Sequence, residues 1–402
     1  MILRNAHLFS QLLREHFPRT EFESLVCKHG AERHARGFRS WTQFVAMLFC
    51  HLGRADSLRE ICSGLACCLG KLVHLGIDRA PNKSSLSYAN AHRPAALFQD
   101  LFWTALARMR SRGQLHCRKR TFRFKNKLLS LDSTTVALCL ALFPWASFRR
   151  AKGGVKVHVL LDHDDYLPAY ILVTEARRHD RFAADLVRLN PGSIVAFDRG
   201  YNDYGRFARW CEERVYFVTR MKDNAAYKVA ERRETRGNIR SDEVIRLSGV
   251  GAWDKCPYLL RRIVVWDAQN EREIVLLTNH LEFAAFTIAA IYKDRWEIEL
   301  FFKALKQNLK IKTFVGTSEN ALLVQIWTAL LAMLLLRWLH HLSRAAWSFS
   351  NMAAMLRLNL FTYRDLEEWL QRPYGAPPPP CDPRAPVQLE LPFPEFGQPI
   401  KI

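Results

Sequence analysis

The sequence predicts an α/β protein in which a mixed sheet follows an all-helical N-terminal region and is interrupted by an inserted β-rich segment. Three observations lead to this prediction. Apolar residues recur at helical spacing up to about residue 125, short β-branched runs begin at residue 126, and one helical stretch separates the third run from the fourth. With 402 residues, of which 49% are hydrophobic, the chain can form two or three domains.

The N-terminal region contains a pair of predicted helices. Residues 57–75 have helical apolar spacing, with Ser57 as a possible N-cap. A turn at 76–82 leads to a short polar helix at 83–93, which Pro94 halts. This pattern is compatible with a helix-turn-helix, although many plain helical hairpins have the same pattern.

The predicted sheet begins with three short strands. The runs 126–138, 153–162 and 166–176 are joined by short loops and are typical of an antiparallel meander. A helical piece at 177–190 separates them from a fourth strand at 192–200. This order suits a mixed sheet of ribonuclease-H type, and other α/β folds share it.

Three further segments complete the chain. The strand-like block 214–282 precedes the next helices and is therefore predicted to be an insertion. The most apolar run, 321–339, contains Gln325 and is short for a membrane span, which favours a buried helix. The tail from residue 372 holds ten of the seventeen prolines and is predicted to be extended or disordered.

The net charge of +20 makes nucleic acid the first partner to consider, ahead of an anionic membrane. Residues 1–128 hold 22 Lys or Arg against 8 Asp or Glu, which gives +14 of the +20. The basic and aromatic run 108–127 favours phosphate contact over a solvated linker. The ten cysteines lack CxxC or zinc-type spacing and the N-terminus lacks a signal peptide, so we expect reduced thiols and a cytoplasmic protein.

One predicted helix, at 291–310, carries two distinct stripes. Tyr292, Arg295, Glu299 and Lys306 are spaced by 3, 4 and 7 residues, which aligns them on one narrow stripe of a continuous helix. The opposite stripe has the spacing of a buried face. It consists of Ile298, Phe301, Phe302, Leu305 and Leu309.

Two aspartates add chemistry to the displayed stripe. Asp132 and Asp198 each follow an apolar run and are predicted to end a central strand. Either residue alone would be a strand-end cap, but together with Glu299 they could bind hard divalent cations such as Mg²⁺. Two such cations suit in-line phosphoryl transfer without a nucleophilic side chain. The sequence contains no Gly-x-Ser-x-Gly elbow and no P-loop.

These residues resemble the bacterial insertion-sequence DDE transposases that carry a Tyr-x2-Arg-x3-Glu-x6-Lys signature. The resemblance covers about residues 10–370, and the signature occurs here with every spacing intact. The flanking motifs are DST at Asp132, a Lys156-x-His158 strand, HD at 179–180 and DRGY at Asp198.

The resemblance implies a ribonuclease-H-like catalytic core with a β-insertion. It also implies a triad of Asp132, Asp198 and Glu299 that binds two Mg²⁺ ions, for which Mn²⁺ can substitute. The signature residues Tyr292, Arg295 and Lys306 would hold DNA phosphates. The expected organisation is a helical DNA-binding domain (1–125), the first part of the core (126–213), the insertion (214–282), the second part of the core (283–345), a helical segment (346–371) and a Pro-rich tail (372–402).

Some relatives of this kind stack a flipped base on a tryptophan of the insertion. Trp253, in a Gly-rich segment, is the better candidate, whereas Trp266 has the pattern of a core residue. Arg199 could contact phosphate or balance the acidic site.

The remaining polar residues of the motifs have simpler interpretations. His158 and Asp162 favour a structural or supporting role over a metal site. His179 and Asp180 precede a helix, and capping is the preferred interpretation.

The expected function is a transposase that binds terminal inverted repeats and target DNA as a homodimer in a synaptic complex. It would act at the bacterial nucleoid, cut DNA and join the 3′ ends. An inactive DNA-binding repressor and a ribonuclease-H-fold nuclease are the alternatives. The sequence leaves open the identity of the repeats, a hairpin intermediate and the helix that reads DNA.

Overall fold

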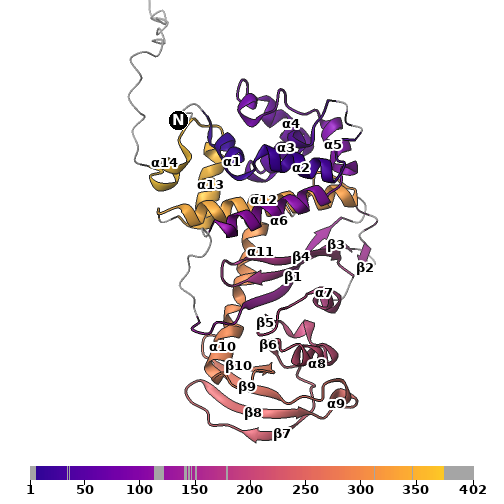
Figure 1. Cartoon of the computed structure of the whole chain (residues 1–402), viewed down its shortest axis with the longest axis vertical. Helices are drawn as coiled ribbons and strands as arrows, with labels where there is room; N and C mark the ends of the chain where they lie inside the picture. Colours follow the sequence, from indigo (N-terminus) through magenta and orange to yellow (C-terminus); the bar gives the residue numbers. More distant parts are fainter. Residues whose placement is uncertain are drawn as a thin grey trace, which may run out of the picture.

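The computed structural model describes residues 6–374, apart from 34, 36, 113–121, 140–142, 144, 146, 150–151, 178–179, 312 and 346. The middle of the basic run 108–127, His179 and the tail beyond residue 374 therefore lie outside the described residues. The chain is elongated, with a cluster of helices at one end and a large sheet at the other (Figure 1).

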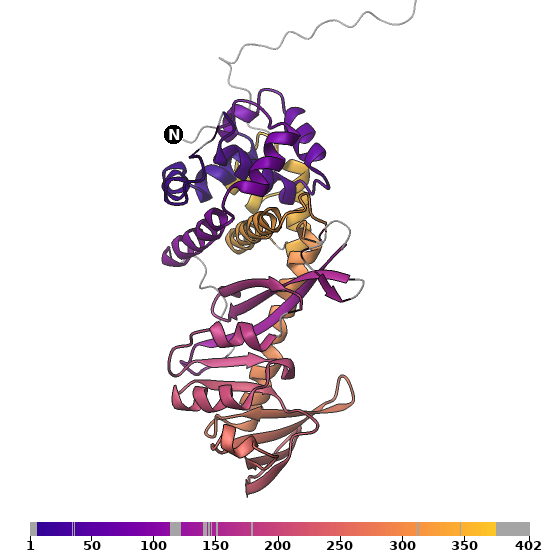
Figure 2. The same cartoon turned by 90° about the vertical axis from the view of Figure 1, so that its right-hand side faces the viewer.

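The helical cluster combines N-terminal and C-terminal segments. The helix α12 packs against α3, α5 and α6, and α6 and α12 lie side by side in both views (Figures 1 and 2). The helices of this region are α1 (Leu8–His16), α2 (Arg19–Lys28), α3 (Ser40–Leu52), α4 (Leu58–Ala66), the 3₁₀ helix η1 (Leu72–Leu75), α5 (Lys83–His92), α6 (Ala96–Ser111), α12 (Glu319–Leu342), α13 (Phe349–Asn359) and α14 (Leu366–Gln371).

Two sequence predictions for this region can be compared with the structure. Ser57 caps α4 by accepting a hydrogen bond from the Glu60 backbone N–H at 3.2 Å, as predicted. The helix predicted over 57–75 is broken, because α4 ends at Ala66 and η1 follows only at Leu72. The segment between α4 and α5 is therefore longer than a standard helix-turn-helix turn.

The apolar run 321–339 lies within α12. Across the described ranges, α12 alone has the length and hydropathy of a membrane span, and most of its residues are buried. Gln325 is fully buried, where its Nε2 donates to the carbonyls of Lys310 and Thr313 at 2.7 and 2.8 Å. The prediction of a buried core helix is confirmed.

The sheet has ten strands in the order β2-β3-β1-β5-β6-β10-β9-β8-β7, and β4 pairs with β3. The β1–β3 and β3–β4 pairs are antiparallel, as the predicted meander requires, and the β1–β5 and β5–β6 pairs are parallel. The strands are β1 (Leu128–Leu138), β2 (Ser147–Arg149), β3 (Lys152–Asp162), β4 (Leu167–Glu175), β5 (Ile194–Phe197), β6 (Tyr216–Arg220), β7 (Tyr227–Arg232), β8 (Ile239–Leu247), β9 (Leu260–Asp267) and β10 (Arg272–Thr278).

The β-rich block continues the same sheet. The strand β10 pairs antiparallel with β6, and β9, β8 and β7 extend the sheet to its far end (Figure 1). Because β6 also pairs with β5, the strand that begins at Tyr216 is part of the central sheet, although the predicted insertion starts at 214. Main-chain pairing to β6 therefore fixes the orientation of the whole block.

The remaining helices accompany the sheet. They are α7 (Asp180–Leu186), the 3₁₀ helix η3 (Arg199–Tyr201), α8 (Tyr204–Glu212), α9 (Ala252–Lys255), α10 (Ala285–Asp294) and α11 (Trp296–Asn308). The helix α11 packs against β1 on one side and α13 on the other, so it links the sheet to the helical cluster.

The helix predicted over 291–310 is interrupted at Arg295, which ends α10 and precedes α11. The backbone N–H of Ile298 bonds to the carbonyl of Arg295 at 3.1 Å, a three-residue step that tightens the chain locally. The predicted apolar stripe of α11 is nevertheless buried as expected. Its residues are Ile298, Phe301, Phe302, Leu305 and Leu309.

Candidate active site

The register of two parallel strands brings Asp132 and Asp198 together. Leu131 of β1 pairs with Phe197 of β5, so the two aspartates are the next residues on adjacent strands. The sequence suggested that Asp132 ends its strand. In the structure, β1 instead continues past Asp132 to Leu138 along β3. Only the pairing with β5 ends there, and this leaves the edge of β1 open beside Asp132.

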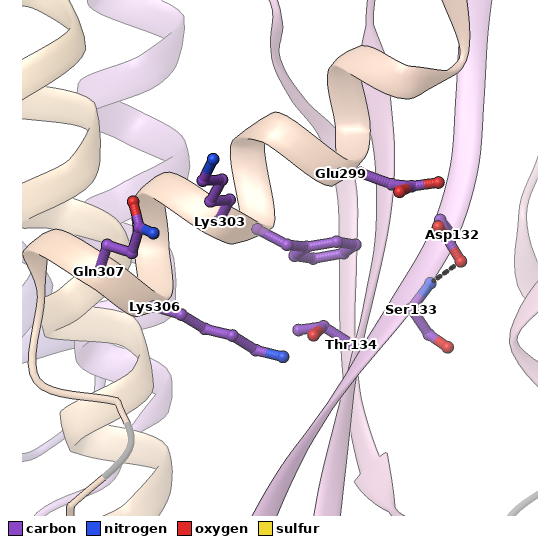
Figure 3. Close-up of a pocket in the computed structure, with 8 residues that line it drawn as sticks. Asp132, Ser133, Thr134, Glu299, Lys303, Lys306 and Gln307 are labelled. Carbon is purple, nitrogen blue, oxygen red and sulfur yellow. Dashed lines mark hydrogen bonds between the residues drawn. The ribbon is translucent and has the colours of Figure 1, made fainter. Parts of the chain in front are cut away.

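Glu299 reaches the same place from α11. Its side chain and that of Asp132 point toward one another across a gap between α11 and β1 (Figure 3). Both residues line a cavity of about 480 Å³. The other residues that line it are Ser133, Thr134, Phe302, Lys303, Lys306 and Gln307.

Arg295 connects the two carboxylates. Its Nη2 donates to Glu299 Oε1 at 2.8 Å and its Nη1 donates to Asp132 Oδ2 at 3.4 Å. Only 11% of the Arg295 side chain is exposed, so the guanidinium is held inside the site. The guanidinium carbon of Arg295 also lies 5.4 Å from the centre of the Tyr292 ring. This cation–π contact keeps the two signature residues together despite the break between the helices.

Two other carboxylates, those of Glu299 and Asp198, affect the pKa of Asp132. The pKa of Asp132 is raised to about 6, mainly by burial, with smaller contributions from the charges of Glu299 and Asp198; the Ser133 N–H and Arg295 act in the opposite direction. The Ser133 N–H donates to Asp132 Oδ1 at 2.8 Å and so fixes one carboxylate oxygen. An acidic cluster of this kind favours binding of a cation.

The carboxylates are not yet arranged as a ligand set. Within the ranges that the structure describes, no three His, Cys, Asp or Glu side chains converge closely enough to hold a metal ion. Arg295 lies between Asp132 and Glu299, and Asp198 Oδ2 accepts a hydrogen bond from the Gly200 N–H at 3.5 Å. The donor chemistry, three carboxylates at one end of a sheet, nevertheless suits a hard divalent cation.

Asp180 supports the site in a way that the sequence interpretation missed. Capping was preferred for this residue, yet its Oδ1 accepts hydrogen bonds from Ser133 Oγ at 3.1 Å and Lys156 Nζ at 3.0 Å. Ser133 follows Asp132 in the chain, so Asp180 contacts the residue that positions the carboxylate. The signal was present in the motifs, but it required the strand register, which pairs Ser133 with His158.

His158 contributes to the same network as a neutral group. Its Nε2 lies 3.0 Å from Thr174 Oγ1 and its Nδ1 lies 3.9 Å from Asp180 Oδ1. Burial lowers the pKa of His158 to about 4, so the imidazole carries no charge at neutral pH. This placement agrees with the supporting role expected for His158.

Of the residues predicted from the sequence, Asp198, Tyr292 and Arg295 do not line the cavity, and neither do Arg199 and Trp253. Arg199 Nη1 donates to Asp223 Oδ2 at 2.9 Å, so it pairs with an exposed carboxylate. Trp253 is half-buried on α9, and the Arg246 guanidinium carbon lies 3.7 Å from the centre of its ring. Trp296, which the sequence analysis did not single out, is 57% exposed on the first turn of α11.

Comparison with known proteins identifies the family of this chain. The family model described as "Transposase DDE domain" matches residues 123–335, and a second one, "Domain of unknown function (DUF4372)", matches residues 4–78. A protein of Sinorhizobium fredii that carries the name of a transposase is 34% identical over 315 residues, which are 76% of this chain and 85% of that protein.

A second relative and one solved structure also match the chain. A protein of Geobacillus stearothermophilus, named as a transposase for an insertion sequence element, is 34% identical over 55% of this chain and 59% of its own length. A piggyBac transposase in a synaptic complex with hairpin DNA matches with a TM-score of 0.48 and 12% identity, over 92% of this chain and 83% of that chain. The chain belongs to the transposase DDE domain family, and it is an insertion-sequence DNA transposase, an enzyme that cuts and joins DNA.

Proposed function

We propose that Asp132, Asp198 and Glu299 form the catalytic triad of this transposase and hold two Mg²⁺ ions, which Mn²⁺ can replace. The DDE domain family uses divalent metal. The observation that carries the assignment is the pairing of Leu131 with Phe197, which sets the two aspartates side by side at the edge that Glu299 faces. The raised pKa of Asp132 supports it, because Glu299 and Asp198 both contribute to the shift.

The proposed catalytic core is ribonuclease-H-like. The support comes from the order β4-β3-β1-β5-β6, in which the first three strands are antiparallel and the last two are parallel to β1. In this assignment the core spans 126–213 and 283–345 and also includes β6, and the insertion runs from the end of β6 to about residue 282. The helices of 1–125 form the DNA-binding domain.

When bound, the metal ions would activate water or a 3′-hydroxyl and stabilise the departing 3′ oxygen. The chain's own groups prepare this chemistry. Arg295 balances the negative charges of Asp132 and Glu299. If its guanidinium paired with a DNA phosphate instead, both carboxylates would become available to bind metal. Tyr292 and Lys306 would hold neighbouring phosphates, Lys306 from the wall of the cavity.

The assembly that we propose is a homodimer that pairs two transposon ends in a synaptic complex at the bacterial nucleoid. It would bind the terminal inverted repeats and then target DNA. Arg199 and Trp253 are proposed DNA contacts away from the cavity. For Trp253 this requires Arg246 to leave one face of the ring, since base stacking needs an open face.

Cleavage of the chain by bound iron tests the metal site independently of DNA chemistry. The protein would be incubated with Fe²⁺ in place of Mg²⁺, treated with ascorbate and peroxide, and its fragments mapped by mass spectrometry. We expect cuts near residues 132, 198 and 299 that excess Mg²⁺ suppresses and that Asp132→Ala reduces. Cuts elsewhere only, or cuts that persist unchanged in the variant, would remove the basis of the assignment.

Replacing Asp180 by alanine is expected to slow DNA cleavage by about 10- to 100-fold, which is the usual effect of losing a group that orients a metal ligand. The variant removes the acceptor of Ser133 Oγ and the partner of Lys156, while Asp132, Asp198 and Glu299 stay in place. Single-turnover cleavage of a transposon-end duplex measures the effect. Asp185→Ala is the control, because it removes a carboxylate of α7 that pairs with Arg206 instead.

The control separates positioning from stability. If Asp180→Asn, which keeps an acceptor oxygen, recovers most of the rate, Asp180 acts by orienting Ser133. Equal losses in Asp180→Ala and Asp185→Ala would instead attribute the effect to the stability of α7.

Replacing Lys306 by alanine is expected to weaken DNA binding uniformly across sequences. If Lys306 neutralises one phosphate, the slope of log affinity against log salt falls by about 0.9. Fluorescence anisotropy with a labelled duplex between low and moderate salt measures this slope. Gln307→Ala, a change at a neighbouring residue of the cavity wall without loss of charge, should leave the slope unchanged.

A further inference from the structure

The helix α5 presents a polar face that the catalytic assignment does not use. Its residues Lys83, Ser84, Ser87, Tyr88 and His92 are exposed, and Tyr88 has 67% of its surface accessible. The ring of Tyr88 stacks on that of His92 with a centroid distance of 4.1 Å. The sequence of α5, KSSLSYANAH, contains no acidic residue, so its face is neutral or cationic throughout.

The opposite face of α5 is fixed firmly in the helical cluster. Leu86, Ala89 and Asn90 are buried, and Asn90 Oδ1 accepts a hydrogen bond from Gln43 Nε2 at 2.9 Å. Asn320, on the first turn of α12, donates to the carbonyls of Asn90 and Arg93 at 2.8 and 2.7 Å. These contacts hold the end of α5 against α12 and leave its outer face exposed.

We propose that α5 is the helix that reads DNA sequence at the transposon end, by entering the major groove with this face. A helix with its side chains is about 10–12 Å across and the groove is about 12 Å wide. Serine and lysine donate to base edges, and the aromatic pair can contact a thymine methyl or the sugar wall. Charge complementarity supports duplex DNA over a second protein surface, because the chain carries +20 and α5 has no carboxylate.

The attachment to α12 gives the reading helix a defined relation to the cutting residue. The helix α11, which carries Glu299, is joined to α12 by residues 309–318, and the two helices pack against one another. Gln325 of α12 donates hydrogen bonds to the carbonyls of Lys310 and Thr313 in this connection. These contacts would set the number of base pairs between the sequence that α5 contacts and the bond that the proposed triad cuts. The inference rests on the proposed function only in taking the transposon end as the DNA.

A pair of matched substitutions tests the proposal. Ser84 and Ser350 are both exposed and both occupy the second residue of a helix, α5 and α13 respectively. Glutamate at either position adds the same negative charge at a helix N-terminus, where it is tolerated. The two variants therefore share the same net charge and differ only in the surface that carries it.

The probes are a labelled duplex with the terminal inverted repeat of the encoding element and a scrambled duplex of the same composition. With the full chain, we expect Ser84→Glu to weaken binding to the repeat about tenfold or more, with a much smaller effect on the scrambled duplex. Ser350→Glu should stay within about twofold of wild type on both. Thermal unfolding of each variant checks that it is folded.

The contrary outcomes are distinct. If Ser84→Glu keeps the wild-type preference for the repeat, or changes dimer formation without changing that preference, α5 does not read the sequence. A wild-type chain that does not distinguish the two duplexes overturns the proposal as well. None of these results bears on the triad, which is judged by cleavage, and Asp132→Ala should bind the repeat like the wild type.

Discussion

Replacing Asp132, Asp198 or Glu299 by alanine is expected to abolish DNA cleavage and strand transfer while binding to the transposon end persists. Each carboxylate would hold an ion that contributes several kcal/mol of transition-state stabilisation, so the loss should be at least about a thousandfold in rate. The substitutions remove no apolar packing, since Asp132 and Glu299 line a cavity and Asp198 caps a short 3₁₀ turn. Binding should therefore survive.

The measurement is a cleavage and joining assay with Mg²⁺ on an end duplex, beside an anisotropy titration of the same duplex. Asp223→Ala serves as the control, because Asp223 is an exposed carboxylate that pairs with Arg199, the residue after Asp198 in the chain. It should cut at close to the wild-type rate. Strand transfer at the normal rate by any one of the three variants would disprove its place in the triad.

The sequence predicted the parts of the fold that depend on local patterns. The buried stripe of α11 follows from residue spacing alone, and all five of its residues are buried. The meander followed from three successive β-rich runs, although the connection between β1 and β3 also contains β2, which was not predicted. The Ser57 cap followed from its position before an apolar helix. These features are set within a few residues of the chain, so the pattern contains the necessary information.

Features that depend on distant pairing could not be read in this way. The continuation of β1 past Asp132 is decided by its partner β3, and the attachment of the insertion by the pairing of β10 with β6. Asp180 looked like a cap because its partners, Ser133 and Lys156, come from two other elements. The break at Arg295 lies in a stretch whose apolar spacing is unbroken, and there the side chain bridges Asp132 and Glu299.

Arg295 also changes how the signature is understood. The residue spacing suggested that the Arg295 side chain is exposed and available to bind phosphate. In the structure this side chain is only 11% exposed and is paired with two carboxylates. A buried guanidinium between two acids stabilises the site before DNA arrives, because the acids would otherwise repel each other. The phosphate contact that the family resemblance implies then becomes an exchange of partners.

Replacing Asp132 by asparagine should make the metal-free protein more stable at alkaline pH. The folded-state pKa of Asp132 is about 6 against an ordinary value of 3.8, so between these pH values the folded state binds more protons than the unfolded state. Stability therefore falls as pH rises from about 4 to 6, and above 6 the charged carboxylate costs about 2–3 kcal/mol. Asparagine has no such charge. The gain in the free energy of unfolding of the Asp132→Asn variant over the wild type should therefore be complete at pH 8 and vanish below pH 4.

Urea unfolding in EDTA at a series of pH values measures this difference, with Asp223→Asn as the control that should follow the wild type throughout. An Asp132→Asn variant that is less stable than wild type at pH 8 would show that the Arg295 contact outweighs burial. Added Mg²⁺ should reduce the difference in stability between the Asp132→Asn variant and the wild type, because it should stabilise the wild type alone. A ligand that binds the folded state raises its stability. The Asp132 carboxylate would then destabilise the metal-free protein, and a bound cation would offset this loss of stability. Selection for catalysis can retain such a destabilising residue.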